Sequence, residues 1–299
     1  MQAGPFHAPP GHAIRRAGTE FALRFFATIL AGLAILCGAT NAAEPTIPNF
    51  WDLKERLPKP ELDGVERLRF LTTVDFPPFN YLDPDGRLSG FHVDLARRIC
   101  AELNILDKCQ IQALPWNELD AALTAGDGEA IIAGIAITAE NREKYVFSRP
   151  YLKFPARFIM PKASAAQEPL VKNLAEKRIG VLAASAHERM LRTLFPTTKV
   201  VTYTKPEWMY EDLRDGKIDG AFGDGMRFAF WLSGADSKGC CRFAGGPYLS
   251  DAYLGQGLAI AVRPDNAILA DAFNYALREI QAKGEFAELY LRHFPLSFY

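Results

Sequence analysis

The chain has 299 residues, of which 49% are hydrophobic and 23% charged, and its formal net charge is -1. This is ample apolar material for a core and long for one ordinary domain, so we expect two domains or one discontinuous domain. The near-zero charge lacks the basic excess of a nucleic-acid binder, and no long run of like charges forms an interaction tail. We therefore expect a small-molecule ligand and no nucleic acid.

The N-terminal segment has the layout of a secretory signal peptide. Three arginines precede an apolar run, Phe25–Leu36, and small and polar residues follow it. The run is about a dozen residues long, whereas a membrane-spanning helix needs roughly 20. We predict a signal peptide over residues 1–43 and a periplasmic protein without stable membrane insertion. A retained anchor and lipidation at Cys37 are the alternatives, although Leu36 stands where lipidation signals usually have Gly or Ala.

Four further cysteines would face an oxidising compartment after export, where pairing is the default. Cys100 and Cys109 flank the expected end of a helix. A disulfide between them would close a loop of about ten residues and stabilise the fold by roughly 2 to 3 kcal/mol. For the adjacent Cys240 and Cys241, a vicinal disulfide, two free thiols and an intermolecular bridge all remain open. No cysteine or histidine cluster has metal-ligand spacing, so we expect neither metal nor cofactor.

Strands and helices alternate in the first half of the exported chain. A proline-rich segment over residues 44–64 predicts an extended arm on the surface. Hydrophobic periodicity then predicts, in chain order, a strand at 67–75, a helix at 91–105, a strand at 109–115, a helix at 116–126 and a strand at 129–137. Gly126 ends the second of these helices.

The same order repeats in the second half. The predicted elements are a strand at 177–185, a helix at 186–195, a strand at 199–203, a helix at 206–216, a strand at 218–224, a strand at 257–266 and two helical segments over 267–294, broken at Gly284. This repetition predicts an α/β fold of two lobes, each a mostly parallel sheet with helices on both faces. The last elements return to the first lobe.

Three segments carry a resemblance to a known family: "FPPFNYLDPDGRLSGFHVDLARRI" at 76–99, "GIAITAENREKYVFSRPY" at 134–151 and "GLAIAVRPDN" at 257–266. In this order and spacing they resemble the extracellular solute-binding proteins of family 3. These are the amino-acid-binding components of ABC importers, and they share the type II periplasmic binding fold. The resemblance extends from about Val65 to Phe294.

The resemblance implies a two-lobed clamp joined by two hinge strands. Residues 65–157 and 253–299 would form lobe 1, and residues 158–252 would form lobe 2, with the chain crossing near 157–162 and 249–256. Such a clamp closes on a ligand that binds the closed form more tightly. ABC permease subunits would be its protein partners, and we expect the binding protein itself to be a monomer.

The resemblance also implies where lobe 1 contacts a ligand. Phe76 occupies the position of the family's stacking aromatic, at the proline-flanked end of the first strand. The backbone of Ala136 and the hydroxyl of Thr138 lie where the family holds the ammonium and carboxylate groups of an amino acid. The structural alternatives are ordinary packing for Phe76 and N-capping of the following turn for Thr138.

The next arginine departs from the family pattern, which reads Thr-x-x-Arg and uses the guanidinium to bind the ligand carboxylate. Counted from Thr138, Asn141 occupies that position and Arg142 follows it, with no insertion to absorb the shift. A one-residue offset turns a side chain by roughly 100 to 180 degrees. Asn141 could offer an uncharged amide, and Arg157 could supply a charge from the hinge. All three are candidate ligand-binding residues, and the shift weakens the expectation of an ordinary α-amino acid ligand.

In lobe 2, Ser185 opens a helix whose N–H groups favour an anion, and Asp224 matches the family's aspartate for the ammonium group. An N-cap and a turn-forming Asp-Gly are the alternatives. We expect His187 to face solvent. Trp116 of lobe 1 could contact the ligand or simply pack. Asp75 stands without a cluster of acids, so a cationic ligand such as lysine or arginine is not favoured.

Two other functions remain open at this stage. The same fold hosts periplasmic enzymes, notably dehydratases acting on cyclohexadienyl or arogenate substrates. Such catalysis needs a protonatable acid in the cleft, and Glu140 and Asp75 are the nearby acids. We expect neither to be catalytic and the protein not to be an enzyme. A sensor or accessory binding protein without a transporter is the second alternative.

Overall fold

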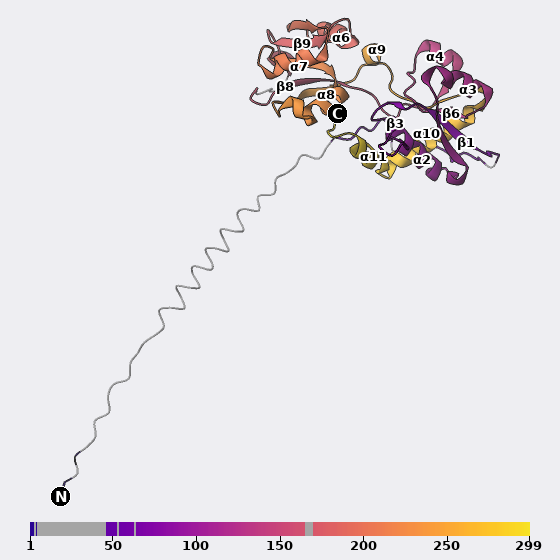
Figure 1. Cartoon of the computed structure of the whole chain (residues 1–299), viewed down its shortest axis with the longest axis horizontal. Coiled ribbons are helices and arrows are strands. Elements are labelled where there is room, and N and C mark those ends of the chain that lie inside the picture. Colours follow the sequence, from indigo (N-terminus) through magenta and orange to yellow (C-terminus); the bar gives the residue numbers. More distant parts are fainter. Residues whose placement is uncertain (3, 5–45, 53, 63, 165–169) are drawn as a thin grey trace. The chain divides into compact units, whose positions relative to one another are not determined.

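The computed structural model describes residues 1, 2, 4, 46–52, 54–62, 64–164 and 170–299 (Figure 1). All helices and strands of the described residues lie in the unit that spans 45–299. The predicted signal peptide, with Cys37, lies outside the described residues except for positions 1, 2 and 4. Within the described part of the chain, no helix has the length and apolar character needed to cross a membrane.

The order of elements follows the predicted alternation. The strands are β1 (Leu68–Thr72), β2 (Asp75–Phe76), β3 (Asn80–Leu82), β4 (Leu88–Ser89), β5 (Cys109–Ala113), β6 (Ala130–Ile131), β7 (Val146–Phe147), β8 (Ala156–Pro161), β9 (Arg178–Leu182), β10 (Lys199–Tyr203), β11 (Gly220–Asp224), β12 (Cys241–Tyr248) and β13 (Ala261–Val262). The α-helices are α2 (Phe91–Glu102), α3 (Leu119–Ala125), α4 (Ala139–Lys144), α5 (Leu170–Asn173), α6 (Ala186–Leu194), α7 (Pro206–Arg214), α8 (Gly225–Ser233), α9 (Asp251–Leu254), α10 (Ala267–Ala282) and α11 (Glu285–His293). Short 3-10 helices are η1 (Leu106–Lys108), η2 (Trp116–Glu118), η3 (Ala235–Ser237) and η4 (Pro264–Asn266).

The first sheet has the strand order β5-β1-β6-β13-β7. Successive residues of β1 face opposite sides: Phe70 lies in a core shared with α2, α10 and α11, and Leu71 lies in a smaller core shared with α3. Both faces of the sheet are therefore covered. In Figure 1 the purple segments β1, α2 and β6 and the yellow helices α10 and α11 lie together in this lobe, so segments far apart in the sequence build it.

The second sheet has the order β10-β9-β11-β8-β12 and is built from the middle of the chain. Phe158 and Phe222 lie in a core shared with α6. Their neighbours Ile159 and Ala221 lie in another core, shared with α7 and α8. Each lobe thus buries its own apolar strands between two helical layers, as the repeated pattern predicted.

Both sheets contain more antiparallel pairing than predicted. β1 runs parallel to β5 and β6, but β13 runs antiparallel to β6 and β7. In the second sheet, β9 runs parallel to β10 and β11, but β8 runs antiparallel to β11 and β12. The reversed strands stand where the chain leaves or enters a lobe. The periodicity of a buried strand does not report its direction, so sequence alone could not reveal this.

The first crossover lies earlier in the chain than predicted. Residues 157–162 begin in β8, which is already part of the second sheet, so the chain crosses between β7 and β8. The second crossover lies between β12 and β13 and contains the predicted 249–256. The two crossovers are hydrogen-bonded to each other, because the Leu258 carbonyl accepts from the Tyr151 N–H at 2.9 Å and the Leu258 N–H donates to the Leu152 carbonyl at 2.7 Å.

The N-terminal arm packs against lobe 1 without forming a helix or strand in its described residues. Trp51 and Leu62 are buried in the first core. Arg149, just before the first crossover, pairs with Glu55 at 2.5 Å and places its guanidinium 5.3 Å from the centre of the Trp51 ring. The arm is therefore attached beside the point where the chain leaves lobe 1.

Both cysteine pairs are bonded. The predicted Cys100–Cys109 disulfide is present and joins the end of α2 to the start of β5. Cys240 and Cys241 form a vicinal disulfide, which decides among the alternatives left open by the sequence. Cys241 is buried in the second lobe beside α7 and α8, so this pair is part of a core.

Candidate functional site

The candidate residues of lobe 1 lie beyond the carboxyl ends of β1 and β6, where parallel sheets place ligands. Phe76 stacks on the buried Phe79, with ring centres 4.7 Å apart. The Phe76 ring also meets Gly134, which has φ +86°, and a Cβ there would lie 2.9 Å from Phe76 Cε1. Only glycine fits this contact, so Phe76 lies directly against the loop that carries Ala136 and Thr138.

A buried chain of polar side chains lies behind Phe76. Asn80 Nδ2 donates to Thr73 Oγ1 at 2.6 Å, His92 Nδ1 lies 2.7 Å from Asn80 Oδ1, and Tyr151 Oη lies 2.8 Å from His92 Nε2. All four side chains are buried. Because burial lowers the pKa of His92 to about 3, the imidazole is neutral at pH 7.

The amide of Asn80 fixes the tautomer of this imidazole. Since its nitrogen donates to Thr73, its oxygen faces His92 and needs a proton from Nδ1. His92 Nε2 then accepts from the Tyr151 hydroxyl, whose pKa burial raises well above its usual value. The network joins the loop of Phe76 to the start of the first crossover. The sequence analysis did not predict this network. The signal for it in the sequence was His92, which stands between the apolar Phe91 and Val93 of α2.

The polar groups of the α4 loop bond to one another. Thr138 is the N-cap of α4 and its hydroxyl accepts from the Asn141 N–H at 3.1 Å. The Asn141 side-chain amide donates to the Ala136 carbonyl at 2.8 Å. The structure therefore brings these three predicted residues together, and the Ala136 carbonyl already accepts one hydrogen bond from the protein.

Arg142 points away from this group. Its Nη2 donates to Gln256 Oε1 at 2.8 Å, and both side chains are exposed. The arginine thus links α4 to the second crossover, as the one-residue offset from the family position suggests.

Arg157 is buried at the start of β8, with 8% of its surface exposed. Its guanidinium lies 4.5 Å from the centre of the Phe243 ring, and its Nε and Nη1 have no hydrogen-bond partner among the described residues. Burial lowers the pKa of Arg157. A Cβ on Gly225 would lie 2.9 Å from Arg157 Cγ, so the stem of the arginine passes directly beneath the start of α8.

Trp116 lies in η2 and is 55% exposed. It lines a hollow of about 240 Å³ together with Asn141 and Tyr145. The Tyr145 hydroxyl donates to Asp120 Oδ1 at 2.6 Å, which fixes one wall of this hollow. Trp116 and Asn141 thus share one surface.

In lobe 2, Ser185 is the N-cap of α6. Its hydroxyl accepts from the Glu188 N–H at 3.0 Å and donates to the Leu182 carbonyl at 2.7 Å. Glu188 Oε2 in turn accepts from the Ala184 N–H at 2.8 Å. The serine hydroxyl therefore caps one N–H of the helix and uses its own proton on Leu182, while Glu188 holds the residue before the N-cap.

Asp224 ends β11 and is the N-cap of α8, accepting from the Arg227 N–H at 2.8 Å. It lines a cavity of about 160 Å³ together with Leu182, His187 and Tyr210. The prediction that His187 faces solvent was wrong, because its ring lies 6.3 Å from Phe222 within this cavity wall. Burial lowers the pKa of His187.

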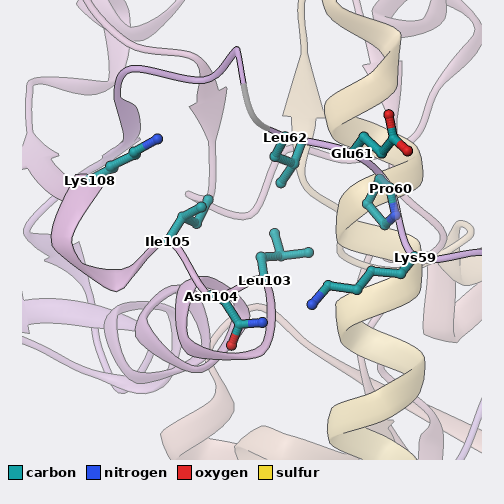
Figure 2. Close-up of a pocket in the computed structure, with 8 residues that line it drawn as sticks. All are labelled: Lys59, Pro60, Glu61, Leu62, Leu103, Asn104, Ile105 and Lys108. Carbon is teal, nitrogen blue, oxygen red and sulfur yellow. The ribbon is translucent and has the colours of Figure 1, made fainter.

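A larger hollow lies at the other end of lobe 1, away from these residues. Figure 2 shows Lys59 to Leu62 of the arm on one side of it, and Leu103, Asn104 and Ile105 on the other. Its volume is about 490 Å³. Lys108, directly before β5, also lines it, so it borders the amino-terminal end of that strand, whereas ligands in open α/β sheets bind at the carboxyl ends. It is therefore not the candidate site. In the described part of the chain, no group of three or more acidic, histidine or cysteine side chains is placed to hold a metal ion.

Comparison with known proteins agrees with this geometry. Residues 68–296 match the profile of the bacterial extracellular solute-binding proteins, family 3, and the chain belongs to this family. The ABC transporter arginine-binding protein 1 of Escherichia coli (strain K12) is 30% identical over 232 residues, which are 78% of this chain and 92% of that protein. The L-arginine-binding protein of Pseudomonas aeruginosa is 30% identical over 267 residues, 88% of this chain and 97% of that protein.

Two solved structures share the fold at low sequence identity. The unliganded, open L-cystine solute receptor of Neisseria gonorrhoeae has a TM-score of 0.66 at 17% identity, covering 78% of this chain and 94% of that chain. An ancestral cyclohexadienyl dehydratase has a TM-score of 0.65 at 21% identity, covering 81% and 99%. The predicted two-lobed type II periplasmic binding fold is therefore confirmed.

Proposed function

We propose that this protein binds an amino acid or a related small carboxylate in the periplasm and delivers it to an ABC importer. The observation that carries the proposal is the pair of polar sites at the carboxyl ends of the strands in both lobes, in a chain of the solute-binding family. The curated relatives reported above are named for binding arginine, and both are covered over nine tenths of their length.

In this proposal each lobe supplies part of one site. Phe76 offers an apolar platform to the ligand, and the loop of Ala136 and Thr138 offers hydrogen bonds. Asp224 accepts the ligand ammonium, which relieves the cost of covering its carboxylate when the lobes close. The N-terminus of α6 at Ser185 favours the carboxylate. Closure of lobe 1, which ends with β7 and resumes with β13, on lobe 2, which extends from β8 to β12, then presents the complex to the permease.

The ligand carboxylate has no free arginine at the family position. Asn141 stands there and already donates to the Ala136 carbonyl, while Arg142 is bonded to Gln256. Arg157 is the cation with unpartnered donors near the hinge. In the proposal Asn141 provides a neutral donor to the carboxylate, and Arg142 or Arg157 contributes when its present contacts rearrange.

The proposed setting follows from the sequence. The signal peptide over residues 1–43 exports the chain, and the arm over 44–64 precedes the clamp. The exported protein works as a monomer with a small-molecule ligand and the permease subunits as partners. Mass spectrometry of the exported protein tests the cleavage site, and sedimentation tests the monomer.

Ligand-dependent thermal stability tests the proposed function. A solute that binds only the folded protein stabilises it by about 2.7 kcal/mol at a concentration 100 times its Kd. We expect one small group of amino acids or carboxylates to raise the melting temperature, and Asp224→Asn to abolish that rise for ligands with an ammonium group. Asp236→Asn, in the 3-10 helix η3 before β12 and not at the carboxyl ends of β9 and β11, is the control. No shift with any amino acid or carboxylate would overturn the proposal.

The proposed function includes no catalysis. The two acids considered from the sequence, Asp75 and Glu140, are both exposed, so neither is held in the dry environment that tunes a carboxylic acid for proton transfer. Incubation with prephenate or arogenate tests this directly. Formation of an aromatic product, lost in Asp75→Asn or Glu140→Gln, would show an enzyme instead.

A further inference from the structure

The cavity in lobe 2 lies where a ligand group would enter from the proposed site. Leu182 ends β9 and Asp224 ends β11, so the cavity borders the carboxyl edge of the sheet. Its walls come from three helices: α6 through His187, α7 through Tyr210, and α8 through Phe228. Asp224 belongs both to the proposed ammonium site and to the cavity wall, which makes the two continuous.

The size of the cavity limits what can fill it. Its volume is about 160 Å³. An apolar cavity of roughly 150 Å³ is known to hold one benzene ring. Leu182, Met209, Phe222 and Phe228 provide apolar walls of the same kind. One aromatic ring fits this space, and two fused rings exceed it.

Tyr210 supplies an unused hydrogen-bonding group. Its ring stacks on Trp231 with centres 4.6 Å apart and an interplanar angle of 15°, so its position is fixed. Its hydroxyl is buried and has no partner among the described residues. Burial raises the pKa of Tyr210, so the hydroxyl keeps its proton at pH 7 and can donate or accept. A buried hydroxyl without a partner is unfavourable, and a polar atom on the occupant of the cavity would satisfy it.

The charges around the cavity favour a neutral occupant. Asp224 and Arg227 both line it and carry opposite charges. When the ammonium group of a ligand pairs with Asp224, Arg227 remains as the uncompensated charge of the wall. It then repels a second cationic group, such as a lysine or arginine side chain. Because burial lowers the pKa of His187, its imidazole is neutral and adds no charge to the same wall.

We infer that this cavity is the side-chain pocket of the ligand, and that it selects an amino acid with a single, neutral aromatic ring carrying a hydrogen-bonding atom. The inference rests on the proposed function and adds the class of side chain. Phenol and neutral imidazole rings meet the requirement, so tyrosine and histidine are the ligands to compare. Phenylalanine lacks the polar atom, tryptophan has two fused rings, and arginine and lysine carry the charge that Arg227 opposes.

Titration calorimetry of the exported chain with these six amino acids and alanine tests the inference. We expect tyrosine or histidine to bind about tenfold more tightly than phenylalanine, since a satisfied hydrogen bond is worth about that factor. Tyr210→Phe should weaken the preferred ligand about tenfold and leave the Kd of phenylalanine and alanine unchanged. Tyr203→Phe is the matched control, because its hydroxyl bonds Asp212 at 2.9 Å outside the cavity.

A second variant separates the side-chain pocket from the rest of the site. Leu182→Phe fills the cavity from its edge, so binding of ring-bearing ligands should fall while alanine still binds. Circular dichroism and melting confirm that each variant is folded. Equal affinity for arginine and tyrosine, or a preference for tyrosine or histidine over phenylalanine that Tyr210→Phe leaves unchanged, would contradict the inferred side-chain pocket. Neither result would contradict amino-acid binding. Binding of no amino acid at all would overturn both the pocket and the proposed function.

Discussion

The two lobes differ in whether their buried polar side chains have hydrogen-bond partners. In lobe 1, a linear chain of hydrogen bonds joins the buried side chains of Thr73, Asn80, His92 and Tyr151. In lobe 2, the Tyr210 hydroxyl is buried at a cavity wall without a partner. Buried side chains that are hydrogen-bonded to one another are held in one geometry, whereas a buried hydroxyl without a partner can bond to a ligand. We therefore expect lobe 1 to provide the rigid platform and lobe 2 to provide the choice of ligand.

The largest expected effect breaks the network of lobe 1. His92→Ala removes its centre and leaves Asn80 Oδ1 and the Tyr151 hydroxyl without partners. The free energy of unfolding should fall by about 3 to 4 kcal/mol, because two buried polar groups lose their bonds and a cavity opens. Urea unfolding measures this. A loss below about 1 kcal/mol would mean that the network does not stabilise lobe 1.

Lowering the pH should lower the free energy of unfolding through His92 of the same network. The pKa of His92 is about 3 in the fold and about 6.5 in the unfolded chain. Between these values the unfolded chain binds a proton that the folded chain does not, so stability falls as the pH falls. The slope is about 1.4 kcal/mol per pH unit, which gives about 2 to 3 kcal/mol between pH 6.5 and 4.5.

The variant His92→Ala provides the control for this pH dependence. Its stability should fall less steeply over the same pH range, because the titrating group is absent. Unfolding at a series of pH values measures both slopes. Parallel curves for the two proteins would contradict a neutral, buried His92.

The stability effects of removing one tyrosine hydroxyl from each lobe compare the two lobes directly. Tyr151→Phe removes the donor to His92 Nε2 and should cost about 1 to 3 kcal/mol of stability. Tyr210→Phe removes a hydroxyl without a partner and should change stability by less than about 0.5 kcal/mol, or raise it. Thermal unfolding of the ligand-free proteins checks the pair. Equal losses would mean that the Tyr210 hydroxyl is already satisfied without ligand.

The smallest expected effect concerns Asn141. Asn141→Ala removes one neutral hydrogen bond at an exposed carbonyl, so stability should fall by about 0.5 kcal/mol. It also frees the Ala136 carbonyl for a ligand ammonium. Because the proposal assigns the Asn141 amide to the ligand carboxylate, affinity should fall by up to about tenfold. Unchanged or improved affinity, measured by titration calorimetry, would instead show that the amide does not bind the ligand and that the freed Ala136 carbonyl contacts the ammonium.

Much of the fold could be predicted because it depends on local patterns. N-capping was the structural alternative to ligand binding for Ser185 and Thr138, and the structure places both residues at N-caps. The Cys100–Cys109 disulfide followed from proximity along the chain. These features involve residues within about ten positions of each other, where spacing determines geometry.

The rest of the site depends on contacts that sequence spacing does not encode. The bond between His92 and Tyr151 joins residues 59 positions apart. The bond between Arg142 and Gln256 joins residues 114 positions apart. The His187 error has the same origin, because the burial of a helix residue near its N-terminus depends on the neighbouring helices and not on its own periodicity.

The paired crossovers have a mechanical consequence. The bonds between Tyr151 and Leu258, and between Leu258 and Leu152, join the two connecting segments at an isolated β-bridge. Sliding one segment past the other breaks these bonds, whereas bending both segments together keeps them. We therefore expect the lobes to rotate about this region, with sliding of the two segments suppressed. Each closing movement would then bring the same residues of the two lobes together.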